Sequence, residues 1–202
     1  DVESRGLGDV YKRQSYYHVE MGGYHFLMCD SNDFGSAQQS WLSGELAKLK
    51  SSEGYDPGEP IFVVMHAPLS GTVLGSGQSF RSSAAVYGIL RDYPQAVVLT
   101  GHSHRDLYDD RAIHQKDFTS VHLGGMQYIE FDGGRIEGSV PAQTGLVHED
   151  GSQSQMNQAV IATVYSDRLV FDRYDFSVDR HLGTWEAVSY THLRAHETRR
   201  HL

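Results

Sequence analysis

Two uninterrupted apolar segments, each followed at once by histidine, constrain this chain more than any other feature. Residues 61–65 (IFVVM) precede His66, and residues 96–100 (AVVLT) precede the segment GHSH, which contains His102 and His104. Short apolar runs without alternation are typical of strands covered on both faces, as in parallel sheets. The carboxyl ends of parallel strands meet at one edge of a sheet, where loops collect functional side chains. The sequence therefore predicts that the three histidines lie at a common site.

The segments around these strands predict an α/β fold built as one domain. Residues 16–30 are typical of two strands that turn at Gly22-Gly23. Apolar residues at helical spacing predict a helix over 38–50, and a second helix is expected from 83 to about 92. From Thr119 onward the pattern indicates only strands and turns: SVHLGG, MQYIEF with a turn at 132–134, and a hairpin that turns at Ser166-Asp167. Residues 144–158 are polar and are interpreted as a surface loop.

The spacing of the GHSH histidines suits a pair of metal ions. In extended backbone, residues i and i+2 point to the same side, with their Cα atoms about 6–7 Å apart. That separation would place one imidazole on each of two ions about 3.5–4 Å apart, as in two-metal hydrolases. A lone histidine at a strand end is more often a hydrogen-bonded surface residue, and this interpretation is given to His18, His25, His114, His122 and His148. Either Asp30 or Asp33 could approach the site, but turn formation explains both adequately.

The order of these motifs resembles the C-terminal part of the calcineurin-like metallophosphoesterases. The resemblance covers roughly residues 16–125: YHFLMCDSN, the QQSWLSGELAKL helix, VVMHAP and VVLTGHSHRD, of which the Gly-His-x-His element is the most specific. It implies a sandwich of mixed β-sheets flanked by helices. It also implies that His66 and His102 bind one metal ion and His104 the other, with two divalent ions drawn from Mn, Fe and Zn and a phosphomonoester or phosphodiester as substrate.

The same resemblance implies ligand motifs that this sequence lacks. They are an Asp-x-His, a Gly-Asp and a Gly-Asn-His-Asp element, which would lie upstream and supply carboxylates. We therefore expect a domain truncated at its N-terminal half and inactive by itself, with at least one buried strand, such as 61–65, left without a neighbour. The alternative is a non-catalytic binding module with a structural or vestigial metal site. A serine hydrolase is a weaker hypothesis, because neither Ser70 nor Ser103 lies in a Gly-x-Ser-x-Gly motif.

The two ends of the chain are expected to lie outside the domain. Residues 4–14 (SRGLGDVYKRQ) and 188–198 (VSYTHLRAHET) can be encoded by the two strands of one DNA segment, read in shifted frames. This inverted repeat resembles a transposase-type sequencing adapter translated in both directions. We therefore assign residues 1–14 and 187–202 to the adapter and residues 15–186 to a partial domain. The other interpretation of the C-terminal end is a basic, histidine-rich tail that binds metal or nucleic acid.

Composition excludes several classes of protein. The net charge of −9 argues against a partner such as nucleic acid, which would require a basic patch. Cys29 is the single cysteine, which leaves no internal disulfide. No apolar run approaches the roughly 20 residues of a membrane span, so no membrane segment is expected in these residues. Nothing in the sequence indicates the cellular location.

Overall fold

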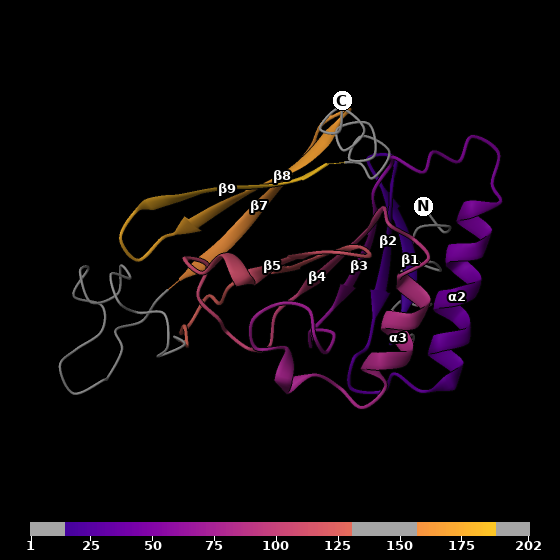
Figure 1. The fold of residues 1–202 in the computed structure, drawn as a ribbon, viewed down its shortest axis with the longest axis horizontal. Coiled ribbons are helices and arrows are strands. Elements are labelled where there is room, and N and C mark those ends of the chain that lie inside the picture. Colours follow the sequence, from indigo (N-terminus) through magenta and orange to yellow (C-terminus); the bar gives the residue numbers. More distant parts are fainter. Residues whose placement is uncertain (1–14, 131–156, 189–202) are drawn as a thin grey trace, which may run out of the picture.

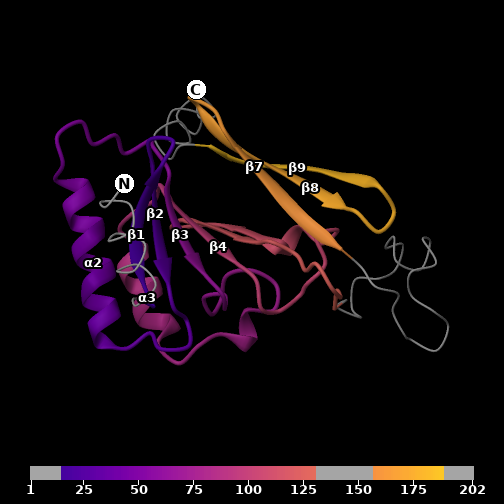
Figure 2. The ribbon, with the colours of Figure 1, turned by 180° about the vertical axis from the view of Figure 1, so that it is seen from behind.

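The structure, a computed structural model, describes residues 15–130 and 157–188. Within these residues, two α-helices, a six-stranded sheet and a three-stranded sheet form three layers (Figure 1). Seen from behind, the helices again lie on the side of the larger sheet that faces away from the smaller one (Figure 2). The larger sheet is therefore the middle layer. The expected α/β arrangement of two packed sheets with helices is confirmed at this level.

The first sheet has a parallel centre with an antiparallel strand at each edge. Its order is β1-β2-β3-β4-β6-β5, in which β2, β3, β4 and β6 are parallel. The hairpin between β1 and β2 turns at Gly22 and Gly23, whose φ angles of 59° and 86° lie in the left-handed region that glycine tolerates. The strands are β1 (Tyr17–Met21), β2 (Tyr24–Cys29), β3 (Ile61–Met65), β4 (Ala96–Thr100), β5 (Ile113–Gln115) and β6 (Thr119–His122).

Two helices cross over between consecutive parallel strands and cover one face of this sheet. Helix α2 (Ser36–Lys50) joins β2 to β3, and α3 (Ser83–Leu90) joins β3 to β4. Both expected helices are confirmed, although α2 begins two residues earlier than its apolar pattern suggested. Their buried side chains pack on residues of β2, β3 and β4, forming a core of Leu27, Leu42, Leu46, Leu49, Ile61, Val63, Met65, Val86, Leu90, Ala96 and Val98 with Phe34, Leu69 and Phe118.

The second sheet is an antiparallel meander of β7 (Gln158–Val164), β8 (Arg168–Asp175) and β9 (Arg180–Val188). The hairpin expected to turn at Ser166-Asp167 is confirmed. Strand β9 continues two residues past the expected boundary at Glu186, and Ala187 is buried and pairs with Leu169. This sheet packs its apolar face on the first sheet, with a second core made of Phe62, Val97, Leu107, Ala112, Val121, Leu169, Phe171, Trp185 and Ala187.

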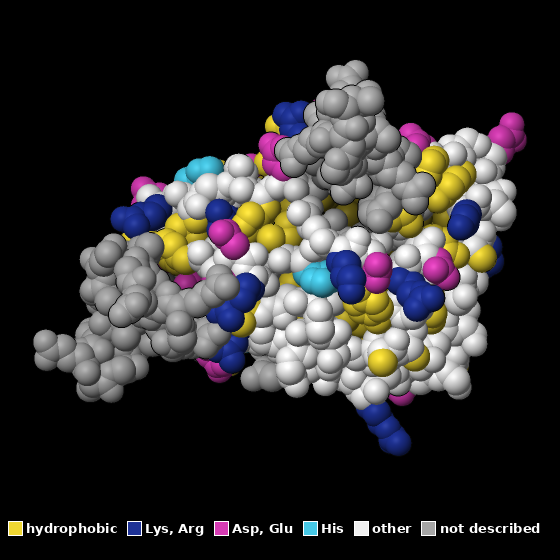
Figure 3. Space-filling model, viewed as in Figure 1, with side chains coloured by type: hydrophobic (Ala, Val, Ile, Leu, Met, Phe, Trp, Pro, Cys, Tyr) yellow, Lys and Arg dark blue, Asp and Glu magenta, His cyan; other side chains and the backbone are white. Residues whose placement is uncertain are grey.

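The surface carries both charges and some apolar groups. On the face shown in Figure 3, Lys and Arg side chains are interspersed with Asp and Glu, and hydrophobic side chains show between them. About half of the surface of Ile161, Tyr165 and Phe176 on the second sheet is exposed. No helix among the described residues is long and apolar enough to cross a membrane.

Two expectations about individual strands are wrong. Strand β3 was expected to lack a neighbour, but it pairs in parallel with β2 on one side and β4 on the other. Residues 126–131 were expected to form a strand, but the described part makes only an isolated parallel bridge, between Arg105 and Glu130. The backbone of this segment bonds to the histidine loop instead, because Glu130 N donates to the carbonyl of His104 at 2.7 Å. The turn expected at 132–134 and residues 144–156 of the loop expected at 144–158 lie outside the described residues. The end of that loop is wrong, because Gln158 is buried and begins β7.

A buried glutamine ties the second sheet to the loop that follows β4. The Gln158 side chain, at the start of β7, accepts a hydrogen bond from Leu107 N at 2.8 Å. Its amide nitrogen donates to Asp106 Oδ1 at 3.0 Å and to Asp175 Oδ2 at 3.2 Å. Burial raises the pKa of Asp106 to about 6. One fully buried side chain therefore satisfies a backbone N–H and two carboxyl groups that would otherwise lack these partners.

We predict that Gln158→Ala destabilises the domain by about 3 kcal/mol, because it leaves the buried Leu107 N–H without its partner and removes one hydrogen bond from each of two buried carboxyls. The measurement is urea unfolding at neutral pH. Gln115→Ala is the matched control: Gln115 is exposed on β5 and donates one hydrogen bond to the carbonyl of Glu186. Its expected cost is below about 0.5 kcal/mol. Equal losses of stability in the two variants would contradict the role given to Gln158.

Candidate metal centre

The parallel strands end in register, and this alignment creates the candidate site. Cys29 at the end of β2 pairs with Met65 at the end of β3, and Thr100 at the end of β4 pairs with His122 at the end of β6. Val64 pairs with Leu99, so β3 and β4 also end level with each other. The loops after all four strands therefore leave the sheet along one edge, which is where open α/β sheets carry their functional groups.

His66 and His102 meet at this edge. His66 directly follows β3, and His102 is the second residue after β4. His66 Nε2 and His102 Nδ1 lie 3.0 Å apart, with ring centroids 4.8 Å apart and the rings nearly perpendicular. Burial, together with the nearby imidazoles of His102 and His104, lowers the pKa of His66. A lowered pKa keeps the imidazole neutral, which is the form that binds metal ions.

The backbone of the GHSH loop is not extended, so the expected geometry of the His102 and His104 pair is wrong. Their φ angles are 67° and 47°, both in the left-handed region that residues with a side chain seldom adopt. Gly101 N donates to the carbonyl of His66 at 2.9 Å, and Ser103 N donates to the carbonyl of Gly101 at 2.8 Å. These bonds fold the loop back on the end of β3. Ser103, between the two histidines in sequence, is buried.

His104 is held by a segment far along the chain. Its Nδ1 lies 3.0 Å from the carbonyl oxygen of Tyr128, and its ring stacks on the Tyr128 ring with centroids 4.1 Å apart and planes 8° apart. Because a carbonyl can only accept, Nδ1 carries the hydrogen in the neutral ring and Nε2 keeps its lone pair. His104 and the Tyr128 carbonyl can come this close because residue 125 is glycine. A Cβ at Gly125 would lie 2.9 Å from His104 Nδ1 and 2.7 Å from the Tyr128 oxygen.

The acidic residues after β2 form a turn. Asp30 Oδ1 accepts a hydrogen bond from Asn32 N at 2.9 Å, which is the Asx turn expected from the sequence. The neighbouring Ser31 is buried, and its hydroxyl oxygen accepts from Ala67 N at 3.0 Å. This bond connects the loop after β2 to the loop that carries His66.

His122 supports the loop from within the sheet. It is fully buried, and its Nε2 accepts a hydrogen bond from Arg105 N at 2.9 Å, directly after His104. Burial is the main cause that lowers the pKa of His122 to about 4, and the charges of His104 and Arg105 act in the same direction. His122 was interpreted from sequence as a hydrogen-bonded surface residue: the hydrogen bond is present, but the surface location is wrong, because the ring is fully buried. The sequence did not show that it anchors the candidate site.

The histidines suit metal ligation, although the described residues do not complete a site. Two nitrogens bound to one ion at about 2.0–2.1 Å in tetrahedral geometry lie roughly 3.3 Å apart, close to the 3.0 Å between His66 and His102. The Tyr128 carbonyl holds His104 as outer partners of metal-bound histidines do. However, within residues 15–130 and 157–188 no three His, Cys, Asp or Glu side chains are placed to hold one ion together. The donor set is therefore partial.

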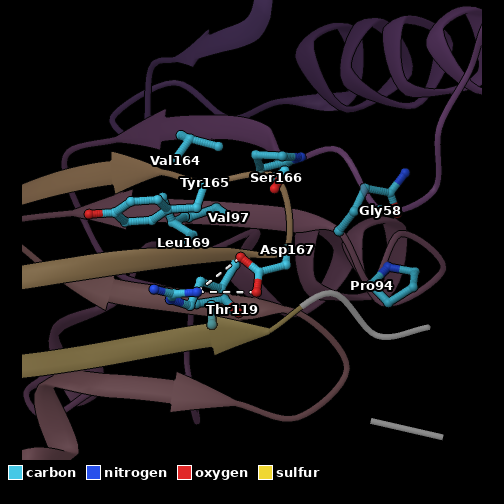
Figure 4. Close-up of a pocket in the computed structure, with 13 residues that line it drawn as sticks. Gly58, Pro94, Val97, Thr119, Val164, Tyr165, Ser166, Asp167 and Leu169 are labelled. Carbon is cyan, nitrogen blue, oxygen red and sulfur yellow. Dashed lines mark hydrogen bonds and ion pairs between the residues drawn. The ribbon is translucent and has the colours of Figure 1, made fainter. Parts of the chain in front are cut away.

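A pocket lies elsewhere on the molecule. It opens between the two sheets near the starts of β4 and β6, at Val97 and Thr119, and beside the turn between β7 and β8 (Figure 4). Tyr165 and Asp167 of that turn line it. Since parallel strands start at the opposite edge from the histidines, this pocket is separate from the candidate centre.

The sequence did not reveal the residues that contact the histidine loop from other parts of the chain. Gly75 is one: its φ is 82°, and a Cβ at this position would lie 2.5 Å from the Ser103 side chain, which leaves no room for one. Tyr128 and Gly125 are others, because their contacts with His104 span more than twenty residues of sequence. The Gly124-Gly125 pair was the one available signal, and it was interpreted only as the end of a strand.

Comparisons with known proteins support the fold alone. No protein-family model matches the sequence, and the search of curated proteins gives no match. Among solved structures, the fold is similar to that of a dimetal phosphatase from Danio rerio, with a TM-score of 0.51 and 13% identity over 89% of this chain. A hypothetical protein from Thermus thermophilus aligns over 87% of this chain at 14% identity, but its TM-score of 0.30 carries no weight. The chain spans about 62% of the phosphatase and 61% of the second protein.

We predict that Gly125→Ala destabilises the domain by about 1–3 kcal/mol, because the added methyl would meet the His104 ring and the Tyr128 carbonyl. The measurement is urea unfolding. Gly77→Ala is the control, since a methyl there meets nothing within 4 Å. A neutral Gly125→Ala would show that the contact between His104 and Tyr128 is loose.

A second prediction concerns pH. The pKa of His122 is about 4 in the folded chain and about 6.5 when unfolded, so the unfolded chain binds the extra proton between these values. The stabilising effect of neutral His122 is complete above pH 6.5 and is lost as the pH falls toward 4. Between pH 7 and pH 5 this loss is about 2 kcal/mol.

The raised pKa of Asp106 makes the folded chain more stable as the pH falls, which opposes the effect of His122. The test therefore compares the pH dependence of the free energy of unfolding in the parent and in a His122 variant. His122→Gln keeps an acceptor for Arg105 N but does not titrate. Urea unfolding at pH 7 and pH 5 should show that the variant loses about 2 kcal/mol less than the parent on acidification. Identical pH dependence would rule out His122 as the titrating group.

Proposed function

We propose that this chain is part of a two-metal phosphoester hydrolase and carries the imidazole side of its active site. In this proposal His66 and His102 bind one divalent ion, from the set Mn, Fe and Zn, and His104 binds the other. The substrate is a phosphomonoester or a phosphodiester. The fold similarity to a dimetal phosphatase agrees with the proposal at the level of the fold.

The observation that carries the proposal is the meeting of His66 and His102 at 3.0 Å. The two histidines come from loops after two different parallel strands, and hydrogen bonds hold both loops in place. Gly101 bonds to the backbone of His66, and Ala67 bonds to Ser31. A hydrogen bond between two surface histidines does not require such support, whereas a ligand pair must be held in place before the ion arrives.

The residues of this chain would bind and orient, and the ions would supply the chemistry. His66 Nε2 and His102 Nδ1 face each other, so both lone pairs can point to one ion. The Tyr128 carbonyl fixes the tautomer of His104 and leaves its Nε2 free for the second position. When bound, two divalent ions act as Lewis acids that neutralise charge on the phosphoryl oxygens.

Further ligands are needed, and the proposal places them outside this sequence. Carboxylates bring negative charge to a pair of hard or borderline cations, which imidazoles cannot do. In the described residues, Asp30 is used in a turn and no third acidic or histidine ligand joins His66 and His102. We therefore propose that the chain hydrolyses no phosphoester alone. The incomplete donor set also favours the second candidate, a binding module with a structural or vestigial metal site.

The assignment of the chain ends to adapter sequence stays a proposal. The C-terminal boundary should be tested after Val188 instead of after Glu186, because β9 continues to that residue and Ala187 is part of the second core.

The prediction for activity compares this chain with a protein extended upstream in its gene. The chain itself should not hydrolyse aryl phosphate monoesters or diesters above metal-only controls, with Mn²⁺ or Zn²⁺ added. The extended protein should hydrolyse one of them, and His104→Ala in that protein should lower kcat/KM by more than about 100-fold, because one ion loses a ligand.

His114→Ala is the control, since His114 lies on β5 at the far edge of the first sheet. It should change kcat/KM by less than about twofold. Full activity of His104→Ala would refute the ligand assignment. Strong activity of the present chain would show that its carboxylates complete the centre, and an inactive extended protein would favour the binding module.

A further inference from the structure

A second histidine pair lies far from the candidate centre, on the hairpin of β1 and β2. His18 pairs with Leu27 on the neighbouring strand and Glu20 pairs with His25, so His18 and His25 are diagonal neighbours on one face. His25 also pairs with Ile61 at the start of β3, whereas His66 follows the end of that strand. The two histidine pairs are therefore separated by about 16 Å along the strand.

The ring nitrogens of this pair face each other directly. His18 Nε2 lies 3.1 Å from His25 Nδ1, and the ring centroids are 5.1 Å apart. The other nitrogen of His18, Nδ1, lies 3.0 Å from Glu45 Oε2 on helix α2, which covers this face of the hairpin. Only about a quarter of the His18 side chain and 13% of the Glu45 side chain are exposed.

Glu45 decides which nitrogen of His18 can bind a cation. A carboxylate can only accept, so His18 Nδ1 carries the hydrogen and Nε2 presents its lone pair to His25. Burial acts to raise the pKa of Glu45, but hydrogen bonds from Lys48 and His18 outweigh it and lower the pKa. The carboxyl is therefore ionised near neutral pH. This chain of carboxylate, imidazole and open lone pair is how proteins orient metal-binding histidines.

We propose that His18 and His25 form a two-histidine site for a divalent transition-metal ion, with Glu45 as the outer partner of His18. Two nitrogens bound at about 2.0–2.1 Å lie roughly 2.9 Å apart in square-planar geometry and 3.3 Å apart in tetrahedral geometry. The observed 3.1 Å lies between these values. The ion takes the place of the hydrogen that His25 Nδ1 donates to His18 Nε2, and this hydrogen moves to Nε2 of His25, so that its Nδ1 offers a lone pair.

The donor set also selects the ion. Two neutral imidazoles beside a buried carboxylate suit a borderline cation, in the order Cu²⁺ above Ni²⁺ and Zn²⁺, and not Mg²⁺ or Ca²⁺. No third His, Cys, Asp or Glu of the described residues completes a cluster here. Water fills the other positions, so the site is weaker than a structural zinc site with four protein ligands.

Trp41 reports on this site. The chain has two tryptophans, Trp41 and Trp185. Trp41 lies on α2 one turn before Glu45 and packs against Tyr16 just before β1. Trp185 belongs to the core between the two sheets. Copper bound between His18 and His25 therefore quenches mainly the Trp41 fluorescence.

The test uses the full chain carrying His66→Gln, His102→Gln and His104→Gln, so that the candidate metal centre is removed. Titration with CuCl₂ should quench tryptophan fluorescence to saturation at one equivalent, and Mg²⁺ should have no effect. Adding His18→Gln or His25→Gln should weaken copper binding at least about tenfold, and Glu45→Gln should weaken it about tenfold. Glutamine keeps a polar side chain of similar length, and circular dichroism checks that each variant is folded.

His181→Gln is the matched control, because His181 is a partly exposed histidine that contacts Asp172 on the second sheet. It should bind copper as the background variant does. The proposal is overturned if His25→Gln binds the first copper ion with unchanged affinity, which would assign that ion to other histidines such as His192, His196 or His201. Because the candidate centre is absent from every protein tested, the result does not depend on hydrolytic activity.

Discussion

The parallel pairing of β2, β3, β4 and β6 is the constraint on which the other features depend. It requires a crossover between successive strands, and α2 and α3 supply two of them on one face. The face of the first sheet that the helices do not cover packs against the second sheet. The parallel pairing also aligns the ends of four strands, so that the loops carrying Ser31, His66 and His102 leave at the same level. A site at this edge is a direct result of the register.

Much of this architecture was readable from sequence because its signals are local. The run 61–65 is apolar throughout and the run 96–100 is apolar up to its last residue, Thr100, and both strands have these bounds. The Gly22-Gly23 turn and the turn at Ser166-Asp167 are likewise chemical signals carried by adjacent residues. Strand β9 was harder to predict, because Gly183 and the polar residues around it in RHLGTWEAV interrupt the alternation that marks a half-buried strand.

The sequence predicted that His66 and His102 leave the sheet at the same edge, but it did not predict the shape of their loops. That His66 and His102 meet depends on the pairing of β3 with β4, which the structure shows and the sequence did not predict. The left-handed backbone at His102 and His104 does not follow from residue type, since histidine seldom adopts it. It is supported by contacts from outside the loop, where Gly75 lies against Ser103 and Tyr128 bonds to His104. These partners are distant in sequence, and no local pattern announces them.

The contrast between the two sheets has a consequence for how the chain folds. Strands β7, β8 and β9 pair with their neighbours in sequence across short turns, so their contacts are local and form quickly. The central strands of the first sheet must each find a partner across a whole helical crossover, which is slow. The meander is therefore expected to assemble first. Until the first sheet forms, the faces of Phe171 and Trp185 that later become core remain in water, where they favour self-association.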